Sequence, residues 1–337
     1  MRLSYLVVSC FVLLTGCTPA PSDIYEEYQR RLENVTLKNG ILDNALTPLK
    51  FKHVKKPKSQ VTLSVLELTR LDHCALMNII AANNNQLGKV RVPSEQLKYA
   101  INFIVHAQHC LNHPETIDDT VKAKLATALE EKKSQLTKYF EQMVFNEREL
   151  SKMLLLTSQE IALEDHQDPL TKALEALTTL THLYTKIALS EPDYSQLEDP
   201  QLITDALATL NKNNSVSRLI TSARKQISSN NLTTQWLNTI EPSKTFCQQN
   251  KNKKKAQILS NIFNKFYLSQ LQGYQSKLTN MLREVSPLLF VLWRSEPQLS
   301  RRFNVESSDS YYQQLKHSAV QHVTWWQKFY KTCKIQP

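Results

Sequence analysis

Glycine is scarce in this chain, and its scarcity limits the possible folds more than any other feature. There are only 4 glycines among 337 residues: Gly16, Gly40, Gly88 and Gly273. Tight β-hairpin turns need positive φ angles, which glycine supplies most readily. Phosphate-cradling loops and nucleophile elbows also depend on glycine. The sequence therefore disfavours hairpin-rich sheets, dinucleotide- and nucleotide-binding loops, and elbow-based hydrolase sites.

Apolar residues recur at helical spacing along most of the chain. Ser94, for example, is followed by Leu97, Ile101 and Ile104, as expected for a capped amphipathic helix. No window alternates as a half-buried strand would. We predict an all-α fold, an elongated multi-helix bundle, with helices over about 23–35, 64–80, 94–110, 117–163 (with a break near Asn146 as an alternative to one continuous helix), 170–189, 201–211, 215–228, 231–240, 243–285, 287–294 and 307–333.

The predicted helices divide into two groups near Asp168-Pro169, which interrupts the helical pattern. Proline removes a backbone donor and restricts the residue before it, so helices end at such sites. We therefore expect two helical subdomains, residues 23–165 and residues 166–337, each with one disulfide.

The first residues resemble a secretory signal peptide. Arg2 precedes an apolar run over residues 3–14. As a helix this run would be about 18 Å long, whereas a bilayer core is about 30 Å thick. The next apolar run, residues 288–293, is shorter still. We therefore interpret residues 1–16 as a signal peptide rather than a transmembrane span.

A cysteine directly follows this apolar run. Leu14-Thr15-Gly16-Cys17 resembles the lipobox of bacterial lipoproteins, in which the cysteine sulfur receives diacylglycerol and the new amino terminus is acylated, for example by palmitate. The resemblance implies that Cys17 is the lipid attachment site and that residues 17–22 form a short tether to the bilayer. Several acyl chains together anchor stably. The alternative is an ordinary secreted protein with a free Cys17.

The residue after the lipobox cysteine bears on the location. It is Thr18 and not aspartate, which by resemblance to the sorting pattern of enteric bacteria favours the outer membrane. We predict a lipid-anchored protein that faces the periplasm.

Four cysteines remain after Cys10 and Cys17 are set aside: Cys74, Cys110, Cys247 and Cys333. An even number in an oxidising compartment suggests two disulfides, and three connectivities are possible. We favour Cys74–Cys110 and Cys247–Cys333, because each bridge then closes within its own half of the chain.

The segment between two of these cysteines carries a family resemblance. "CALMNIIAANNNQLGKVRVPSEQLKYAINFIVHAQHC", residues 74–110, resembles a family of uncharacterised lipoproteins of marine gammaproteobacteria. Their shared core is a cysteine, an apolar helix, an "LGKV" turn, a Pro-Ser helix start and a second cysteine. The asparagine-rich run before the turn departs from the serine-containing form of that family. The family is a domain of unknown function, so the resemblance implies no activity and no site residues.

The densest group of metal-ligating residue types is "HAQHCLNH", which holds His106, His109, Cys110 and His113. Imidazole and thiolate both bind zinc or copper. A metal would need Cys110 as a thiolate, however, and the predicted disulfide uses that sulfur. We therefore favour histidines near a helix end, where the dipole stabilises positive charge, and expect neither a metal nor a cofactor.

No local motif indicates catalysis. Serines and histidines are numerous, but no signature joins a nucleophile to a base. The adjacent carboxylates Asp118 and Asp119 are typical of the first turn of a helix. We interpret the aromatic cluster Trp325, Trp326, Phe329 and Tyr330 as part of a helix buried on most sides; the alternative is a recognition groove.

The net charge of +10 favours acidic partners. Two basic runs contribute to it, Lys50–Lys58 and Lys251–Lys255, and either run is interpreted first as a solvated segment. The predicted location makes nucleic acid an improbable partner. We predict a non-catalytic adaptor or binding module of the cell envelope that binds an envelope protein or an anionic envelope polymer. The alternatives are an envelope-acting enzyme, which would be metal-dependent through the His106 region, and a carrier of an apolar ligand.

Overall fold

The computed structural model describes residues 19–38, 40, 45–84, 91–164, 170–189, 194, 199–248 and 253–337. Within these ranges every regular element is helical and no strand occurs, so the all-α prediction is confirmed. The predicted signal peptide, Cys17 and the turn at residues 85–90 lie outside the described residues.

The helices follow one another along the whole described chain. They are α1 (Pro21–Thr36), α2 (Val65–Thr69), α3 (Ala75–Asn84), α4 (Pro93–Leu111), α5 (Asp119–Asn146), α6 (Arg148–Ser151), the 3₁₀ turn η2 (Lys152–Leu154), α7 (Thr171–Ile187), α8 (Gln201–Lys212), α9 (Ser215–Asn238), α10 (Pro242–Thr245), α11 (Lys254–Ile262), the π-helix η4 (Phe263–Leu271), α12 (Gln272–Leu292), α13 (Pro297–Phe303) and α14 (Tyr311–Cys333).

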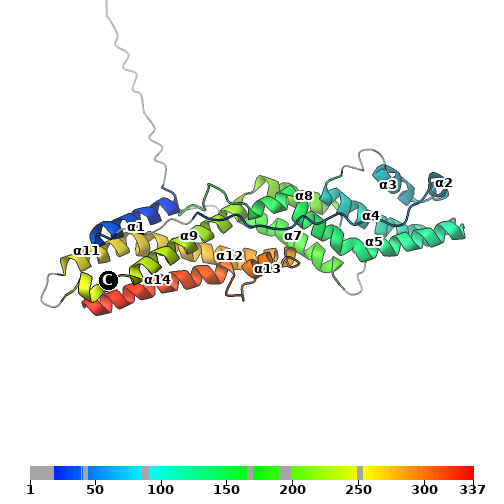
Figure 1. Ribbon diagram of the computed structural model, residues 1–337. Coiled ribbons are helices and arrows are strands. Elements are labelled where there is room, and N and C mark those ends of the chain that lie inside the picture. The colour runs from blue at the N-terminus through cyan, green and yellow to red at the C-terminus, as the bar shows by residue number, and fades with distance from the viewer. Residues whose placement is uncertain are drawn as a thin grey trace, which may run out of the picture.

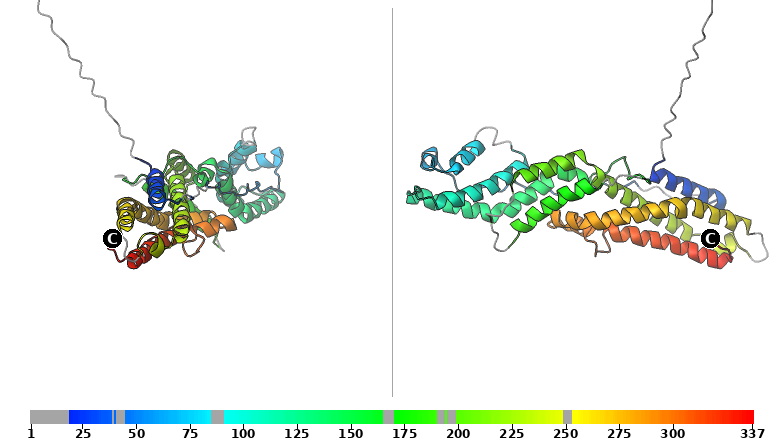
Figure 2. Two further views of the ribbon diagram at one scale, coloured as in Figure 1. Left: turned by 60° about the vertical axis from the view of Figure 1, so that its left-hand side comes forward. Right: turned by 180° about the vertical axis from the view of Figure 1, so that it is seen from behind.

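These helices build a long rod (Figure 1). α1, α11 and α14 lie at one end together with the C-terminus, and α2 to α5 lie at the other end. The view from behind in Figure 2 shows the same elongation, and the view turned by 60° foreshortens the rod. The predicted elongated multi-helix bundle is therefore confirmed.

Several predicted helix boundaries were wrong, and each has a local cause. The 64–80 helix is split by turns at residues 70–74. The 117–163 pattern is broken at Asn146, which confirms the alternative of a break there, and it does not continue as a long helix beyond that point. Glu147 there leaves the helical conformation (ψ 131°) and its carboxylate accepts the Ser94 amide at 2.8 Å. Ser94 lies in the first turn of α4, so this contact satisfies a donor that the helix itself leaves free.

The predicted helix over 243–285 also differs from the observed one. Its first turn is the separate α10, and the next helix of the described residues, α11, begins at Lys254. From there α11, η4 and α12 follow without a break to Leu292, through Pro287. Proline removes one helical hydrogen bond, but the neighbouring Val285 and Leu289 are fully buried and hold this turn in the core.

The structure forms both expected disulfides. Cys74–Cys110 joins the residue before α3 to the last turn of α4, and Cys247–Cys333 joins the segment after α10 to the end of α14. The second bridge explains why the chain leaves helical structure after α10, because it holds residue 247 against α14.

The buried apolar residues form two clusters. The first cluster draws on α3, α4, α5, α7, α8, α12 and the beginning of α9. The second draws on α1, α11, η4, α14 and the end of α9. Each cluster includes residues from both sides of position 165, the boundary we expected between subdomains; that boundary stays a prediction.

A network of buried polar side chains lies where the two clusters meet; we call it the polar seam. Asn230 of α9 and Gln275 of α12 exchange two amide hydrogen bonds of 3.1 and 3.2 Å. Tyr25 of α1 donates to Asn230 at 2.7 Å, and Tyr267 of η4 donates to Gln275 at 3.0 Å. Buried polar groups need such partners, and here the partners come from four different helical elements.

His322 of α14 continues the polar seam and is fully buried. Its Nε2 lies 2.8 Å from the Tyr28 hydroxyl, and its Nδ1 lies 3.0 Å from the Thr234 hydroxyl. The Trp326 indole N–H donates to the Tyr28 hydroxyl at 3.0 Å and to His322 Nε2 at 3.3 Å, so Nε2 is an acceptor. Nδ1–H then donates to Thr234, and the ring is neutral. Burial lowers the pKa of His322 to about 3.

Candidate functional site

The histidines singled out by the sequence do not form a ligand set among the described residues. His109 is exposed on α4, and His106 and His113 are partly exposed. In the part of the chain that the structure describes, the potential metal ligands that come within 4.8 Å of one another are instead His73, Cys74 and Cys110. The two sulfurs are bonded to each other in the disulfide, so neither offers a thiolate.

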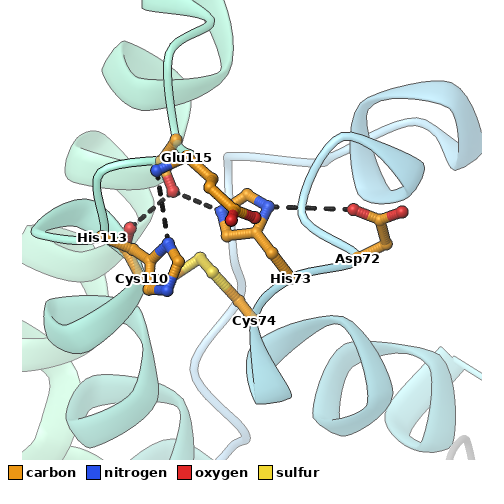
Figure 3. The surroundings of a disulfide bond; sticks show 7 residues. Asp72, His73, Cys74, Cys110, His113 and Glu115 are labelled. Atoms are coloured by element: carbon orange, nitrogen blue, oxygen red, sulfur yellow. Dashed lines mark hydrogen bonds and ion pairs between the residues drawn. A yellow bond between two sulfur atoms is a disulfide. The ribbon is translucent and has the colours of Figure 1, made fainter.

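Figure 3 shows His73 and His113 beside this disulfide, with Asp72 on the far side of His73. The hydroxyl of Thr116 connects two of the chain segments that meet here. Thr116 donates to the Cys110 carbonyl oxygen at 2.7 Å, which uses its single proton. His73 Nε2, 2.6 Å from the same hydroxyl, must therefore be the donor. The His73 and His113 rings lie 4.9 Å apart, and Asp72 approaches His73 Nδ1 at 3.8 Å. The arrangement fixes the turn between α4 and α5 against the start of α3.

We call the extended segment over residues 45–63 the strap. From Val54 onward it runs along α5, whereas Thr47 accepts from Arg224 of α9. Asn146, at the end of α5, exchanges two hydrogen bonds with the backbone of Val54, at 2.6 and 3.0 Å. Glu131, halfway along α5, accepts the Gln60 amide at 2.9 Å. The strap is therefore antiparallel to α5, and it is fastened by side chains of that helix rather than by the backbone of a neighbouring strand.

A cleft of about 680 Å³ opens between the strap and helices α3, α4 and α5. This volume is within the range of small-molecule sites. The described lining has no carboxylate and consists of Lys56, Pro57, Lys58, Ser59, Val61, Thr62, Leu63, Ile80, Asn83, Asn84, Gln96, Tyr99, Phe103, Ala128, Lys132 and Tyr139.

Lys132 is the most constrained cation of this cleft. It is only 7% exposed, and its ammonium donates to the Tyr139 hydroxyl at 2.7 Å. The ammonium also lies 4.9 Å from the Tyr139 ring centroid and 5.8 Å from that of Tyr99. Burial lowers the pKa of Lys132, and the charge of Glu131 opposes that shift.

Two further cations lie close to Lys132. Burial lowers the pKa of Lys56, and the charges of Lys132 and Arg91 lower it further. The Arg91 guanidinium lies 6.0 Å from the Tyr99 ring centroid and donates to the Ala82 carbonyl at 3.0 Å. Positive charge from the strap, α5 and the start of α4 therefore converges on one cleft.

The two tyrosines of the cleft remain neutral donors. Burial raises the pKa of both Tyr99 and Tyr139 to about 12. Because Tyr139 accepts from Lys132, its own hydroxyl proton is available to an acceptor in the cleft. The cleft thus combines ammonium and hydroxyl donors with apolar residues in one lining.

Lys132, Tyr99 and Tyr139 were not expected from the sequence, although the apolar pattern of α5 marks the position of Lys132. Leu125, Leu129, Leu136 and Met143 form an apolar stripe on α5, and Lys132 occupies the position between Leu129 and Leu136. A lysine at a core position of an amphipathic helix is unusual and is costly to bury. The apolar spacing on either side of it is therefore enough to single out this residue.

The basic runs and the aromatic cluster have separate outcomes. Lys56 and Lys58 of the first run line the cleft, and Lys50 lines a second groove with Arg301 and Arg302. In the second run Lys251 lies outside the described residues, and Lys254 begins α11. The cluster of Trp325, Trp326, Phe329 and Tyr330 is buried, as predicted. The helix that carries it is not buried on most sides, however, because α14 exposes one side that includes His317 and Lys328.

Together these features define a class: an all-α, rod-shaped protein with two disulfides and a cationic cleft beneath a strap. The chain belongs to the family described as "Protein of unknown function (DUF3080)", whose model matches residues 25–337. The match includes both disulfides and every residue of the cleft. No curated protein and no solved structure matches the chain.

Proposed function

We propose that this protein is a lipid-anchored, non-catalytic binding module of the cell envelope, and that the cleft beneath the strap binds an acidic group of its partner. The observation that carries this proposal is the convergence of Lys56, Lys58 and Lys132 on a cleft whose described lining has no carboxylate. These cations repel one another, and Glu131, whose charge acts on Lys132, lies outside the lining. An acidic partner relieves that repulsion, so the free energy of binding has a clear source.

The location belongs to the same proposal. Leu14-Thr15-Gly16-Cys17 supports lipid attachment at Cys17 and a periplasm-facing position at the outer membrane. Two disulfides fit an oxidising compartment. None of the described helices combines the length and apolar character needed to cross a bilayer. The partners that fit are an anionic envelope polymer or an envelope protein with an acidic surface; nucleic acid is not among them.

Crosslinking in intact cells tests the binding role. A photoreactive amino acid at position 58, at the cleft, should capture a specific partner. The same group at His317, which is exposed on α14 outside the cleft lining, is the control. Capture at 58 that is lost when Lys132 is replaced by methionine supports the proposal. Equal capture at both positions, or none at 58, contradicts it.

Metabolic labelling tests the anchor. Wild-type protein should incorporate labelled palmitate and fractionate with the outer membrane, whereas Cys17→Ser should do neither. Cys10→Ser is the matched control, because Cys10 lies in the predicted signal peptide. Labelling that persists in Cys17→Ser, or a mature amino terminus at another residue, would contradict the anchor.

A further inference from the structure

We propose that the cleft is a phosphate site with an apolar wall, and that it binds a phosphate monoester carried on a single acyl or alkyl chain. This inference rests on the proposed binding role and names the ligand class for the same site. It joins two properties of the cleft: a donor-rich end and an apolar side.

The donor-rich end requires an acceptor with several oxygens. Lys132 and Tyr139 of α5 offer N–H and O–H donors, and Lys56 and Lys58 of the strap offer further ammonium groups. These donors come from two separate elements, so one ligand group must accept from both directions. A phosphate monoester has three terminal oxygens and a charge of about −1.5 to −2 at neutral pH. A carboxylate has two oxygens and a single charge, so it pairs with fewer of these donors.

Lys132 argues for an ion rather than a neutral polar group. Its ammonium is buried, and its hydrogen bond within the described chain goes to a neutral tyrosine. A buried charge is costly unless it is paired. An anion in the cleft would compensate that charge, and the attraction is strong because water is partly excluded there. The same contact would restore the ordinary proton affinity of the lysine.

The apolar side gives the ligand its second part. Val61 and Leu63 come from the strap, Ile80 from α3, Phe103 from α4 and Ala128 from α5. Free inorganic phosphate would leave this wall unused. Burial of a methylene group contributes about 0.8 kcal/mol, so a chain along this wall adds affinity that the headgroup alone does not have. One chain suits the cleft, because these five apolar residues share a volume of about 680 Å³ with the cations and the tyrosines.

Calorimetry on the full chain tests the inference, with Cys17→Ser present so that attached lipid does not compete. The probes are dodecyl phosphate below its micelle concentration, inorganic phosphate, sodium dodecanoate and the neutral dodecyl maltoside. We expect one dodecyl phosphate per chain, at least tenfold tighter than each of the other three, with affinity that falls as salt is added.

Two matched pairs of variants locate the site. Lys132→Met should weaken dodecyl phosphate binding at least tenfold, whereas Lys133→Met, whose ammonium pairs with Glu130, should not. Lys56→Met should weaken dodecyl phosphate binding several-fold and Lys55→Met should not, because Lys56 belongs to the cleft lining and Lys55 does not. The second pair lies on the exposed strap, so it remains informative if Lys132→Met changes the packing of α5.

Each contrary outcome overturns a stated part of the inference. If dodecyl phosphate and dodecyl maltoside bind equally well, the cleft does not recognise a phosphate. If inorganic phosphate binds as well as dodecyl phosphate, the alkyl chain contributes nothing to binding. Equal behaviour within both variant pairs would place the site elsewhere. If no probe binds while position 58 still captures a partner in cells, the ligand class is wrong and the binding role stands.

Discussion

Lys132 occupies a position on α5 that the apolar stripe reserves for a hydrophobic side chain. Such residues reduce stability and are retained where they bind something. We predict that Lys132→Met increases the free energy of unfolding by about 1 kcal/mol, because a buried ammonium is replaced by an apolar chain of similar length. Urea denaturation measures it. Lys133→Met should change little, and a less stable Lys132→Met protein would show that the ammonium serves the fold.

His322 makes the stability of the protein depend on pH. Its pKa is lowered from 6.5 to about 3 in the folded protein. Between these two pH values, His322 therefore binds a proton in the unfolded chain but not in the folded one. Stability therefore falls as the pH drops from 6.5 towards 3, by about 1.4 kcal/mol per pH unit for this group. Above pH 6.5 the contribution of this group is constant.

Replacing His322 by glutamine tests this dependence. The glutamine amide retains a donor and an acceptor for Thr234 and Tyr28, but it does not titrate. We predict that His322→Gln removes most of the slope of unfolding free energy between pH 6.5 and 4. His317→Gln, on the exposed side of the same helix, should keep the wild-type slope. If His322→Gln keeps the wild-type slope, the pH dependence of the unfolding free energy comes from other groups.

At the scale of elements, the strap is held by side-chain hydrogen bonds from Arg224, Glu131, Gln135 and Asn146. Asn146 holds it at Val54 through two hydrogen bonds. Asn146→Ala should therefore release the strap locally, at a cost of about 1 kcal/mol, without melting α5. We predict about fivefold faster tryptic cleavage after Lys52, Lys55 and Lys58, since cleavage follows local opening. Ser134→Ala, on the exposed face of α5, is the control; unchanged cleavage in Asn146→Ala would mean that the other contacts suffice.

The Cys74–Cys110 bridge holds α3, which buries only Leu76 and Ile80 of its own residues. Replacing both cysteines by alanine should lower the free energy of unfolding by about 4 kcal/mol by the chain-entropy relation for a loop of this length. Hydrogen exchange should show the loss of protection concentrated in α2 and α3. A uniform loss over α9 and α14 would instead mean that the bridge stabilises the whole rod.

The helices could be predicted from the sequence because their apolar spacing is local information. The disulfides followed from the number and placement of the cysteines. The strap could not be predicted, since its partners are side chains of α5 that lie 70 to 92 positions away. The cleft depends on the strap, so its lining was beyond reach as well. The exception is Lys132, whose place in an apolar stripe is visible in the sequence.

At the scale of the whole molecule, the polar seam joins two apolar clusters that could otherwise behave independently. α9 and the continuous helix from Lys254 to Leu292 pass through both clusters. We predict that Asn230→Ala, which removes the partner of Tyr25 and Gln275, costs about 2 kcal/mol yet leaves one unfolding transition. Calorimetry, together with fluorescence that reports separately on the two clusters, shows whether there is one transition. Two separate transitions would show that the seam, rather than the shared helices, couples the clusters.

The rod also separates the two proposed contacts of the protein. α1, which follows the proposed tether, packs on the second cluster, while the cleft lies at the end formed by α2 to α5 (Figure 1). An anchored rod of this kind would hold its ligand site away from the point of attachment, and the strap would connect the two regions along the surface.

The placement of α1 has a consequence for how the chain reaches its native state. Tyr25 and Tyr28 find their partners 205 and 294 positions later in the sequence. During synthesis from the amino end, Tyr25 therefore cannot reach its partner until α9 has emerged, and Tyr28 not until α14, the last helix of the described chain, has emerged. Contacts of such long range make folding slow, so a chaperone that shields the first sixty residues would have its greatest effect on yield.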